Sequence, residues 1–165
     1  MRAARTVHAS RRARSARVTA VVSSVLSSGV LFGTVASLTP SKRGFDSFTY
    51  TTVQQATVRN LRPIMGVLLP TSVLANLAVF LTADHRHNSR ARRNALTGLL
   101  GPLSSLLLTA RWELPMNSQV LAWHLDNPPA DWTATRDRWE MVHLIRTATA
   151  LIGLSGTLAA PSTQT

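Results

Sequence analysis

The sequence predicts an all-α protein, an integral membrane four-helix bundle with short extra-membrane helical segments. Two observations lead to this fold class. Four apolar stretches alternate with polar connections, and only 15% of the 165 residues are charged whereas 45% are hydrophobic, a balance typical of membrane proteins. The membrane domain is expected over residues 18–160. An arginine-rich cytoplasmic tail over residues 1–17 is expected to be disordered, and residues 161–165 form a short tail.

The four apolar stretches are residues 18–38, 63–83, 95–110 and 141–160. A bilayer core about 30 Å thick needs about 20 helical residues, which every stretch but the third supplies. The third reaches this length if Arg111 and Trp112 lie in the membrane interface. A helix of a soluble bundle would show a polar face with a period of 3.6 residues, and the first two stretches show none. The pattern therefore favours membrane helices.

Prolines and glycines inside these stretches are expected to shape the helices. Pro70 and the Gly101–Pro102 pair predict kinks, which membrane helices tolerate when neighbouring helices satisfy the freed backbone groups. Gly29 and Gly33 have the small-xxx-small spacing that lets two helices approach closely. The alternative is that these two glycines reflect the ordinary small-residue composition of membrane helices.

Most of the positive charge lies beside the apolar stretches. The net charge of +11 would by itself suggest a nucleic-acid partner. The sequence does not show the alternating basic and aromatic residues of nucleic-acid-binding surfaces, so we expect no nucleic-acid partner. Six arginines lie in residues 1–17 and four in residues 84–94. Both segments fall on one side if all four stretches cross. Because such residues favour the cytoplasmic side, the chain is predicted to be multi-pass in the cell membrane with both termini cytoplasmic.

A cleaved signal peptide is the alternative for the first stretch. The basic start, the apolar run and the small residues Val35, Ala36 and Ser37 fit that pattern. The serine-broken run is long for a signal peptide, so we expect the span to be retained.

Two helix boundaries are predicted around the last polar connection. Pro128 and Pro129 stop any earlier helix and Asp131 is a suitable N-cap, so the last helix is expected to begin near Asp131, outside the bilayer. Pro115 is expected to end the third helix. Asn117 would then lie just beyond the break, with an amide that can both donate and accept a hydrogen bond.

The last helix carries a polar stripe. Trp132, Arg136, Trp139, His143 and Arg146 are spaced by 4, 3, 4 and 3 residues, which places them on one helical face. A stripe of aromatic, cationic and imidazole groups suits the wall of a pocket.

The stripe has a second interpretation, which is anchoring at the membrane interface. Trp and Arg side chains commonly do this, and anchoring suits Trp132 and the neighbouring Arg138. His143 and Arg146 lie one to two turns inside the span, where an ionisable group is costly unless it faces a cavity or a partner. We therefore expect these two residues to belong to a functional site.

Further polar side chains lie on the same predicted side of the membrane. Glu113 is expected to pair with Arg146 or Arg136, and Gln55 and Asn60 precede the second apolar stretch. Together these groups would form a site rich in amide and guanidinium donors. Such donors stabilise developing negative charge on oxygen or hold a carboxylate.

No metal or cofactor site is predicted, although a metal stays open. The chain has no cysteine, which removes thiolate ligands and thiol nucleophiles. Glu140 and His143 form a single Glu-x-x-His pair, whereas di-iron bundles use two such pairs and two further glutamates. His124 and Asp126 do not complete the set. The sequence also lacks a glycine-rich phosphate loop, a serine nucleophile elbow and a His-Glu-x-x-His motif.

The residues around the last helix match the pattern of a known family. They are Pro115, Asn117, Trp123, the Pro-Pro-x-x-Trp of residues 128–132, Arg136, Trp139, His143, Arg146 and Thr147. With these residues the chain resembles the anthrone oxygenase-like family of small four-helix integral membrane proteins, a family mostly of unknown function. The resemblance covers residues 18–160 and is most specific over residues 114–147.

The resemblance implies a membrane-bound tailoring enzyme of specialised metabolite biosynthesis. Such an oxidoreductase would oxidise an activated, enolisable aromatic substrate with O2 as co-substrate and no other cofactor. His143 is then expected to be the base, with Arg146, Arg136 and Asn117 as donors to the enolate oxygen. Substrate contacts are expected from Trp139, Trp132, Gln55, Asn60 and Glu113.

Two other functions fit the same residues. Three arginines and few aromatic residues suit a small carboxylate-bearing, amino-acid-derived metabolite that undergoes a rearrangement or another tailoring step. A non-enzymatic membrane scaffold or transport helper would need the bundle without the site. The expected partners are the lipid bilayer and a small-molecule substrate, and a homo-oligomer stays open.

The four-crossing topology can be tested with reporter fusions. The same topology reporter fused after Arg93 and after Asp126 should give opposite signals, cytoplasmic for the first and external for the second, because the third apolar stretch separates the two positions. Identical signals from both fusions would rule out this layout.

Overall fold

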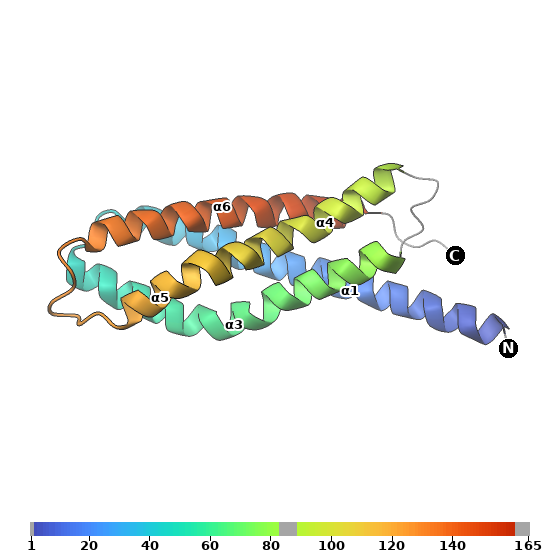
Figure 1. The fold of residues 1–165 in the computed structure, drawn as a ribbon, viewed down its shortest axis with the longest axis horizontal. Helices are drawn as coiled ribbons and strands as arrows, with labels where there is room; N and C mark the ends of the chain where they lie inside the picture. The colour runs from blue at the N-terminus through green and yellow to red at the C-terminus, as the bar shows by residue number, and fades with distance from the viewer. Residues whose placement is uncertain (1, 83–88, 161–165) are drawn as a thin grey trace.

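The computed structural model describes residues 2–82 and 89–160, and for residues 2–10 the backbone alone. Its four long helices are α1 (Arg2–Gly33), α3 (Ser47–Thr82), α4 (Ser89–Leu108) and α6 (Trp132–Ala159). They lie side by side and successive helices run in opposite directions (Figure 1). Both α1 and α4 pack against α3 and α6, so the four helices enclose a common interior. The predicted all-α four-helix bundle is confirmed.

Short elements extend two of the long helices. The π-helical turn η1 (Thr34–Leu38) joins α1 to α2 (Thr39–Lys42), and a second π-helical turn, η2 (Thr109–Glu113), joins α4 to α5 (Leu114–Leu121). A proline lies just beyond each turn, Pro40 after η1 and Pro115 after η2. Proline lacks an N–H and its ring clashes with the carbonyl four residues back. A π-helical turn accommodates both, because it adds one residue to the turn.

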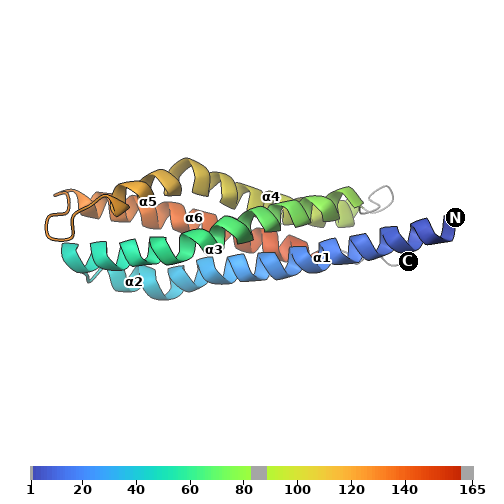
Figure 2. The same ribbon diagram turned by 90° about the horizontal axis from the view of Figure 1, so that it is seen from below.

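The prediction that Pro115 ends the third helix is wrong. The backbone stays helical from Ser89 to Leu121 because η2 absorbs the missing hydrogen bond. The chain bends where α4 meets α5 (Figure 2). Asn117 therefore lies inside α5 and not beyond a helix break.

The ends of α1 and α6 bear on two further predictions. α1 begins at Arg2, where the sequence suggested a disordered tail over residues 1–17. Arg and Ala dominate that segment and are both strong helix formers, which explains the helix. α6 begins directly after Asp131, as predicted, although the Asp131 side chain makes no capping hydrogen bond. The predicted tail over residues 161–165 lies outside the described residues.

Three helical segments of the described chain are long and apolar enough to cross a membrane. They are Arg11–Lys42, Ser47–Thr82 and Trp132–Ala159. Large apolar side chains point out of the bundle along them: on α3, Val67, Leu74 and Leu81 are 66%, 65% and 71% exposed. Contiguous outward apolar surface of this kind is suited to lipid. The chain is accordingly a membrane protein.

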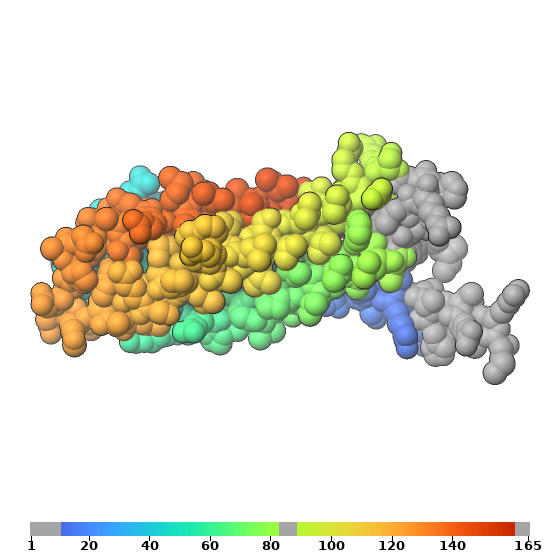
Figure 3. All heavy atoms as spheres, in the orientation of Figure 1, coloured from blue at the N-terminus to red at the C-terminus, as the bar shows by residue number. Residues whose placement is uncertain are grey.

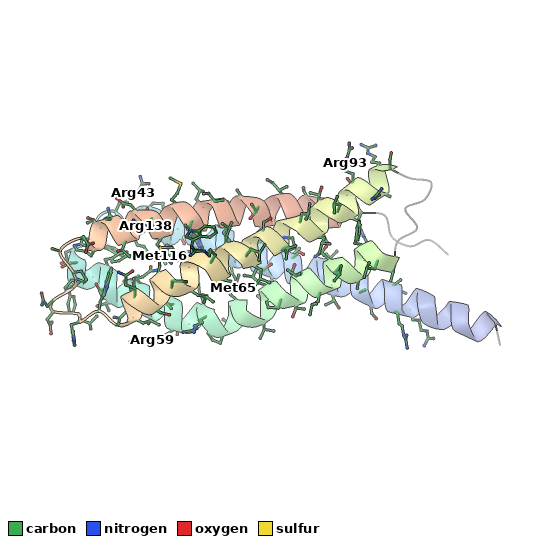
Figure 4. The ribbon with its side chains drawn as sticks, in the orientation of Figure 1. Arg43, Arg59, Met65, Arg93, Met116 and Arg138 are labelled. Carbon is green, nitrogen blue, oxygen red and sulfur yellow. The ribbon has the colours of Figure 1, made fainter. Side chains whose placement is uncertain are left out.

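The third predicted span lies in α4, which is not among these three segments. This helix opens with arginines at residues 90, 92 and 93, and Arg93 lies at the end of the bundle where α1 begins and α6 ends (Figure 4). α4 nevertheless runs obliquely along one face of the bundle between α3 and α6 (Figure 3). That four helices cross the bilayer therefore stays a prediction.

Glycines bring α4 and α6 into backbone contact. A Cβ added to Gly101 would lie 2.6 Å from the Gly153 nitrogen, and one added to Gly156 would lie 2.6 Å from the Gly98 nitrogen. Both separations are shorter than any ordinary contact of a Cβ atom. The two helices therefore approach as closely as small residues allow in membrane bundles.

Polar side chains join α1, α3 and α6 beside this contact. Ser24 Oγ lies 2.8 Å from Ser72 Oγ, and Asn76 Nδ2 donates to Ser24 Oγ at 3.1 Å. Thr157 Oγ1 in turn donates to Asn76 Oδ1 at 2.8 Å. These buried groups satisfy one another inside the bundle, as polar groups away from water must.

Gly29 and Gly33 do not make the close approach that their spacing suggested. Within the described chain, nothing lies within 4 Å of the position that a Cβ would take at either glycine. Their presence agrees with the alternative, ordinary small-residue composition.

We predict that Gly101→Ala lowers the free energy of unfolding by about 1–3 kcal/mol or more, because the new methyl group overlaps the α6 backbone. The matched control Gly29→Ala adds the same group in open space. It should leave stability unchanged or raise it slightly, since Ala is the better helix former. Thermal unfolding in detergent, followed by circular dichroism, compares the two variants. Equal melting temperatures would contradict the glycine contact.

Candidate functional site

A cavity of about 630 Å³ lies inside the bundle and is lined by all four long helices. Most of its wall is apolar, with residues such as Leu31, Leu61, Met65, Leu69 and Leu106. Its polar groups come mainly from one side, built by η2, α5 and α6: Thr109, Glu113, Asn117, Trp139, His143 and Arg146. An apolar chamber with one polar wall suits an apolar substrate that reacts at one edge.

The polar wall centres on three buried ionisable residues. Arg146 Nη1 pairs with Glu113 Oε2 and also donates to Thr109 Oγ1 at 2.9 Å. The other amino group, Nη2, lies 2.9 Å from His143 Nδ1, and Glu113 Oε1 lies 3.2 Å from that same nitrogen. None of the three residues is more than 5% exposed. The predicted pairing of Glu113 with Arg146 is confirmed.

Local helix geometry explains how these groups meet. His143 and Arg146 are three residues apart and therefore lie on one face of α6. Thr109 and Glu113 are the first and last residues of η2, which turns both toward that face. Inside an apolar bundle neither charge would be tolerated alone, so Glu113 and Arg146 neutralise each other.

His143 Nδ1 has two competing neighbours. A guanidinium can only donate, so a bond from Arg146 requires a bare Nδ1 and leaves the proton on Nε2. A bond to Glu113 requires the proton on Nδ1, because a carboxylate only accepts. In that second tautomer Nε2 carries a lone pair and can take a proton.

Two nitrogen atoms of this cluster are buried and unpaired. Neither His143 Nε2 nor Arg146 Nε has a hydrogen-bond partner at normal geometry among the described residues, although the Leu31 backbone lies close enough to interact with the His143 imidazole. Buried polar atoms are rarely left in this state. Both residues line the cavity, but these two atoms are themselves buried, so a bound molecule reaches them only after a small adjustment of the cavity wall.

Trp139 holds the edge of the polar wall. Its ring stacks on His143 with centroids 4.6 Å apart and planes 12° apart, and its Nε1 donates to Asn117 Oδ1 at 2.9 Å. Lys42 Nζ lies 4.3 Å from the centroid of the Trp139 ring. The imidazole is therefore fixed by an aromatic ring that is itself held from α5 and α2.

Lys42 is a residue of this region that sequence reasoning missed. It is fully buried and donates to Gln54 Oε1. One signal in the sequence was available, because Lys42 is the single lysine among 18 basic residues. An interior amine differs from the snorkelling arginines around it, and it lies within range of a cation–π contact.

Arg136 and Trp132 lie outside the cavity. Arg136 pairs with Asp137 at 2.9 Å and lies 5.3 Å from the Trp132 ring. Trp132 packs against Tyr50, with centroids 5.1 Å apart. Tyr50 precedes Thr57, the first α3 residue of the cavity wall, by seven residues, which is about 10 Å of helix. Trp139, His143 and Arg146 of the predicted stripe thus face the cavity. The first two residues of the stripe, Trp132 and Arg136, lie beyond the end of the cavity.

Gln55 and Asn60 do not reach the cavity either. Gln55 Nε2 donates to the carbonyls of Val120 and Trp123, both at 3.0 Å, and its oxygen accepts from Arg59 at 3.1 Å. Its amide is therefore occupied in tying α3 to the end of α5. Asn60 is exposed on the outer side of α3.

The Glu-x-x-His pair of α6 does not converge on one point. Glu140 Oε2 lies 3.8 Å from Arg43 Nε, whereas His143 faces Glu113 in the cavity. Among the described residues no three His, Asp or Glu side chains group as metal ligands would.

Comparison with known proteins gives one match. The family model described as anthrone oxygenase matches residues 61–156, a segment that contains η2, α5 and the whole polar wall. No curated protein and no solved structure matches the chain.

We predict that Glu113→Gln lowers the free energy of unfolding by roughly 3–5 kcal/mol, because it leaves the Arg146 guanidinium buried without a counter-charge. The double variant Glu113→Gln/Arg146→Met removes both charges at similar volume and should recover part of that loss. Asp137→Asn is the control, since Asp137 is 66% exposed and exposed pairs contribute about 0–1 kcal/mol. Chemical unfolding in detergent measures all three. A double variant no more stable than Glu113→Gln argues against the mutual neutralisation.

Proposed function

The chain belongs to the anthrone oxygenase family, and from this premise we propose that it is a membrane-embedded oxygenase of specialised metabolite biosynthesis. Its substrate is an enolisable aromatic compound with an activated ring CH2 group, bound in the cavity and oxidised by O2. One observation carries the proposal: two residues of the cavity wall, His143 and Arg146, each keep one buried nitrogen without a hydrogen-bond partner among the described residues.

His143 is the general base of the proposed reaction. With its Nδ1 proton directed at Glu113, Nε2 is free to remove a proton from the activated CH2 group. Glu113 then stabilises the imidazolium that forms. Trp139 keeps the imidazole plane fixed, so the base is held in place while it accepts the proton.

Arg146 is the donor to the developing enolate oxygen. Its Nε–H is unpaired, and Nη1 is held by Glu113 and Thr109. Nη2 lies beside His143 Nδ1 but does not donate to it when that nitrogen carries the proton. A donor fixed before the reaction stabilises new negative charge without reorganising. Asn117 has its amide oxygen occupied by Trp139 and supplies its NH2 group as a second donor.

The overall reaction balances without another oxidant. The substrate CH2 group loses a proton to His143, and the resulting carbanion gives electrons to O2 and bonds to it, forming a peroxide after protonation. Loss of the second C–H proton with cleavage of the O–O bond gives a ketone and water. One CH2 group and one O2 thus become one C=O group and one H2O.

The carboxylate-bearing metabolite is less well supported by this geometry. Its recognition would need a guanidinium with uncompensated charge, and Arg146 is already neutralised by Glu113. Arg136 lies outside the cavity and pairs with Asp137. Arg62 also lines the cavity, but it is exposed, and exposed ion pairs contribute little. A non-enzymatic scaffold would not need a buried base beside a cavity.

The proposed location is the cell membrane, with four crossings and both termini in the cytoplasm. The arginines at the start of α4 lie at the same end of the bundle as the start of α1 (Figures 1 and 4), which supports that orientation through the preference of basic residues for the cytoplasmic side. A protein embedded in the bilayer also suits a substrate that partitions into the bilayer.

We predict that His143→Ala and Arg146→Ala each lose most activity toward an anthrone, with His143→Ala slowed by about 10²–10⁴-fold. Arg138→Ala should keep near-normal turnover, because Arg138 is exposed and lies off the cavity. O2 consumption and ketone formation are measured in lipid nanodiscs at equal amounts of folded protein, with and without a metal chelator. Near-normal turnover of His143→Ala, or loss of activity on chelation, would overturn the proposed base or the cofactor-free reaction respectively.

A further inference from the structure

A second hollow, of about 570 Å³, lies between the η1–α2 segment and the start of α6. We call it the interfacial groove. Four charged residues line one part of it: Arg43, Arg136, Asp137 and Glu140. Trp139 and Glu140 are consecutive on α6, and Trp139 lines the cavity whereas Glu140 lines the groove. The groove is therefore separate from the candidate active site.

Glu140 is the buried acceptor of the groove. The residue is 9% exposed, and its Oε1 is buried without a hydrogen-bond partner among the described residues. Its Oε2 has a distant ion pair, 3.8 Å from Arg43 Nε, and the buried Lys42 and Tyr50 lie within electrostatic range of the carboxylate without a hydrogen bond to Oε1. Thr39 Oγ1, a second buried and unpartnered polar atom, lines the same groove. A buried carboxylate oxygen with no partner is a site for a cation that can donate a hydrogen bond.

Arg43 is the exposed cation of the groove. Its side chain is 75% exposed and it lies at the end of the bundle opposite Arg93 (Figure 4). Arg136 is already engaged with Asp137. Arg43 is therefore the guanidinium that can hold an anionic group next to the cation on Glu140.

The other part of the groove is apolar and faces outward. Val35, Met141 and Leu144 line it, and the last two are 59% and 52% exposed. On both walls the charged residues lie toward the end of the bundle and the apolar residues lie farther along the membrane-spanning segments. This order matches a lipid molecule, whose charged head lies at the interface and whose acyl chains extend into the bilayer.

We propose that the interfacial groove binds a membrane phospholipid with a primary-amine headgroup, such as phosphatidylethanolamine. Its ammonium group donates to Glu140 Oε1, its phosphate pairs with Arg43, and its acyl chains lie along Met141 and Leu144. A choline headgroup has no N–H and makes no such hydrogen bond, and an anionic headgroup without an amine leaves Glu140 unpaired. The groove therefore distinguishes headgroups by hydrogen bonding and not by net charge alone.

Native mass spectrometry of the detergent-purified full chain tests this proposal. Phosphatidylethanolamine and phosphatidylcholine with identical acyl chains are titrated separately, and the bound fractions are compared. The natural chain should bind the amine lipid about tenfold more tightly, since a hydrogen bond to a charged group is worth that ratio or more. Equal binding of the two lipids overturns the proposal.

Three variants assign the contacts. Glu140→Gln should remove most of the preference for the amine lipid, whereas Arg43→Gln should weaken both lipids and keep the preference. Arg138→Gln is the matched control, because Arg138 is an exposed arginine of α6, the helix that carries Glu140, and lies outside the groove. This variant should bind both lipids as the unmodified chain does. Because Arg43 is largely exposed, its variant stays folded and informative. The assignment is wrong if Glu140→Gln keeps the preference for the amine lipid, or if Arg43→Gln binds both lipids as tightly as the unmodified chain.

Discussion

Glu113 and Arg146 bring two opposite charges into the interior of an apolar bundle, and the geometry of the cavity depends on keeping them together. Neither charge is tolerated there alone, so their contact fixes the separation of η2 and α6. His143 takes its orientation from both members of the pair. The result is a polar wall that is neutral as a whole but keeps one imidazole nitrogen and one guanidinium nitrogen without partners among the described residues.

The glycine contact between α4 and α6 lies toward one end of the bundle, which we call the closed end, and the cavity lies toward the other. Along α4, the glycine contact with α6 comes first and the cavity wall follows; along α6 the order is reversed. The two helices touch backbone to backbone near Gly101 and then diverge as α4 bends at η2 (Figure 2). Chamber and contact are thus two consequences of one bend, with the hydrogen-bonded serines of α1 and α3 strengthening the closed end.

Much of the fold was predictable because apolar length and charge position are one-dimensional properties. The depth of His143 and Arg146 in the last span, together with the nearby Glu113, identified three residues that do meet. Arg136 and Gln55 show the limit. Helical spacing predicts which face of a helix carries a side chain, but not which part of the neighbouring helix lies opposite that side chain. Arg136 lies two turns before His143 on the same face, and it contacts Asp137 and Trp132 outside the cavity. The prediction that Pro115 ends a helix was wrong for another reason. A proline ends a helix only when the turn before it cannot widen into a π-helical turn.

The two π-helical turns have a consequence for how such chains diverge. Each is in effect a one-residue insertion that a helix has absorbed without a loop, and each supplies residues to the chamber, Thr34 from η1 and Thr109 and Glu113 from η2. One residue of helix corresponds to a rotation of about 100°. Gain or loss of a single residue at either turn would therefore rotate the adjoining helix by that angle and change which of its side chains face the cavity, while every loop kept its length. In this architecture, the rotation of a helix about its axis decides which side chains line the interior.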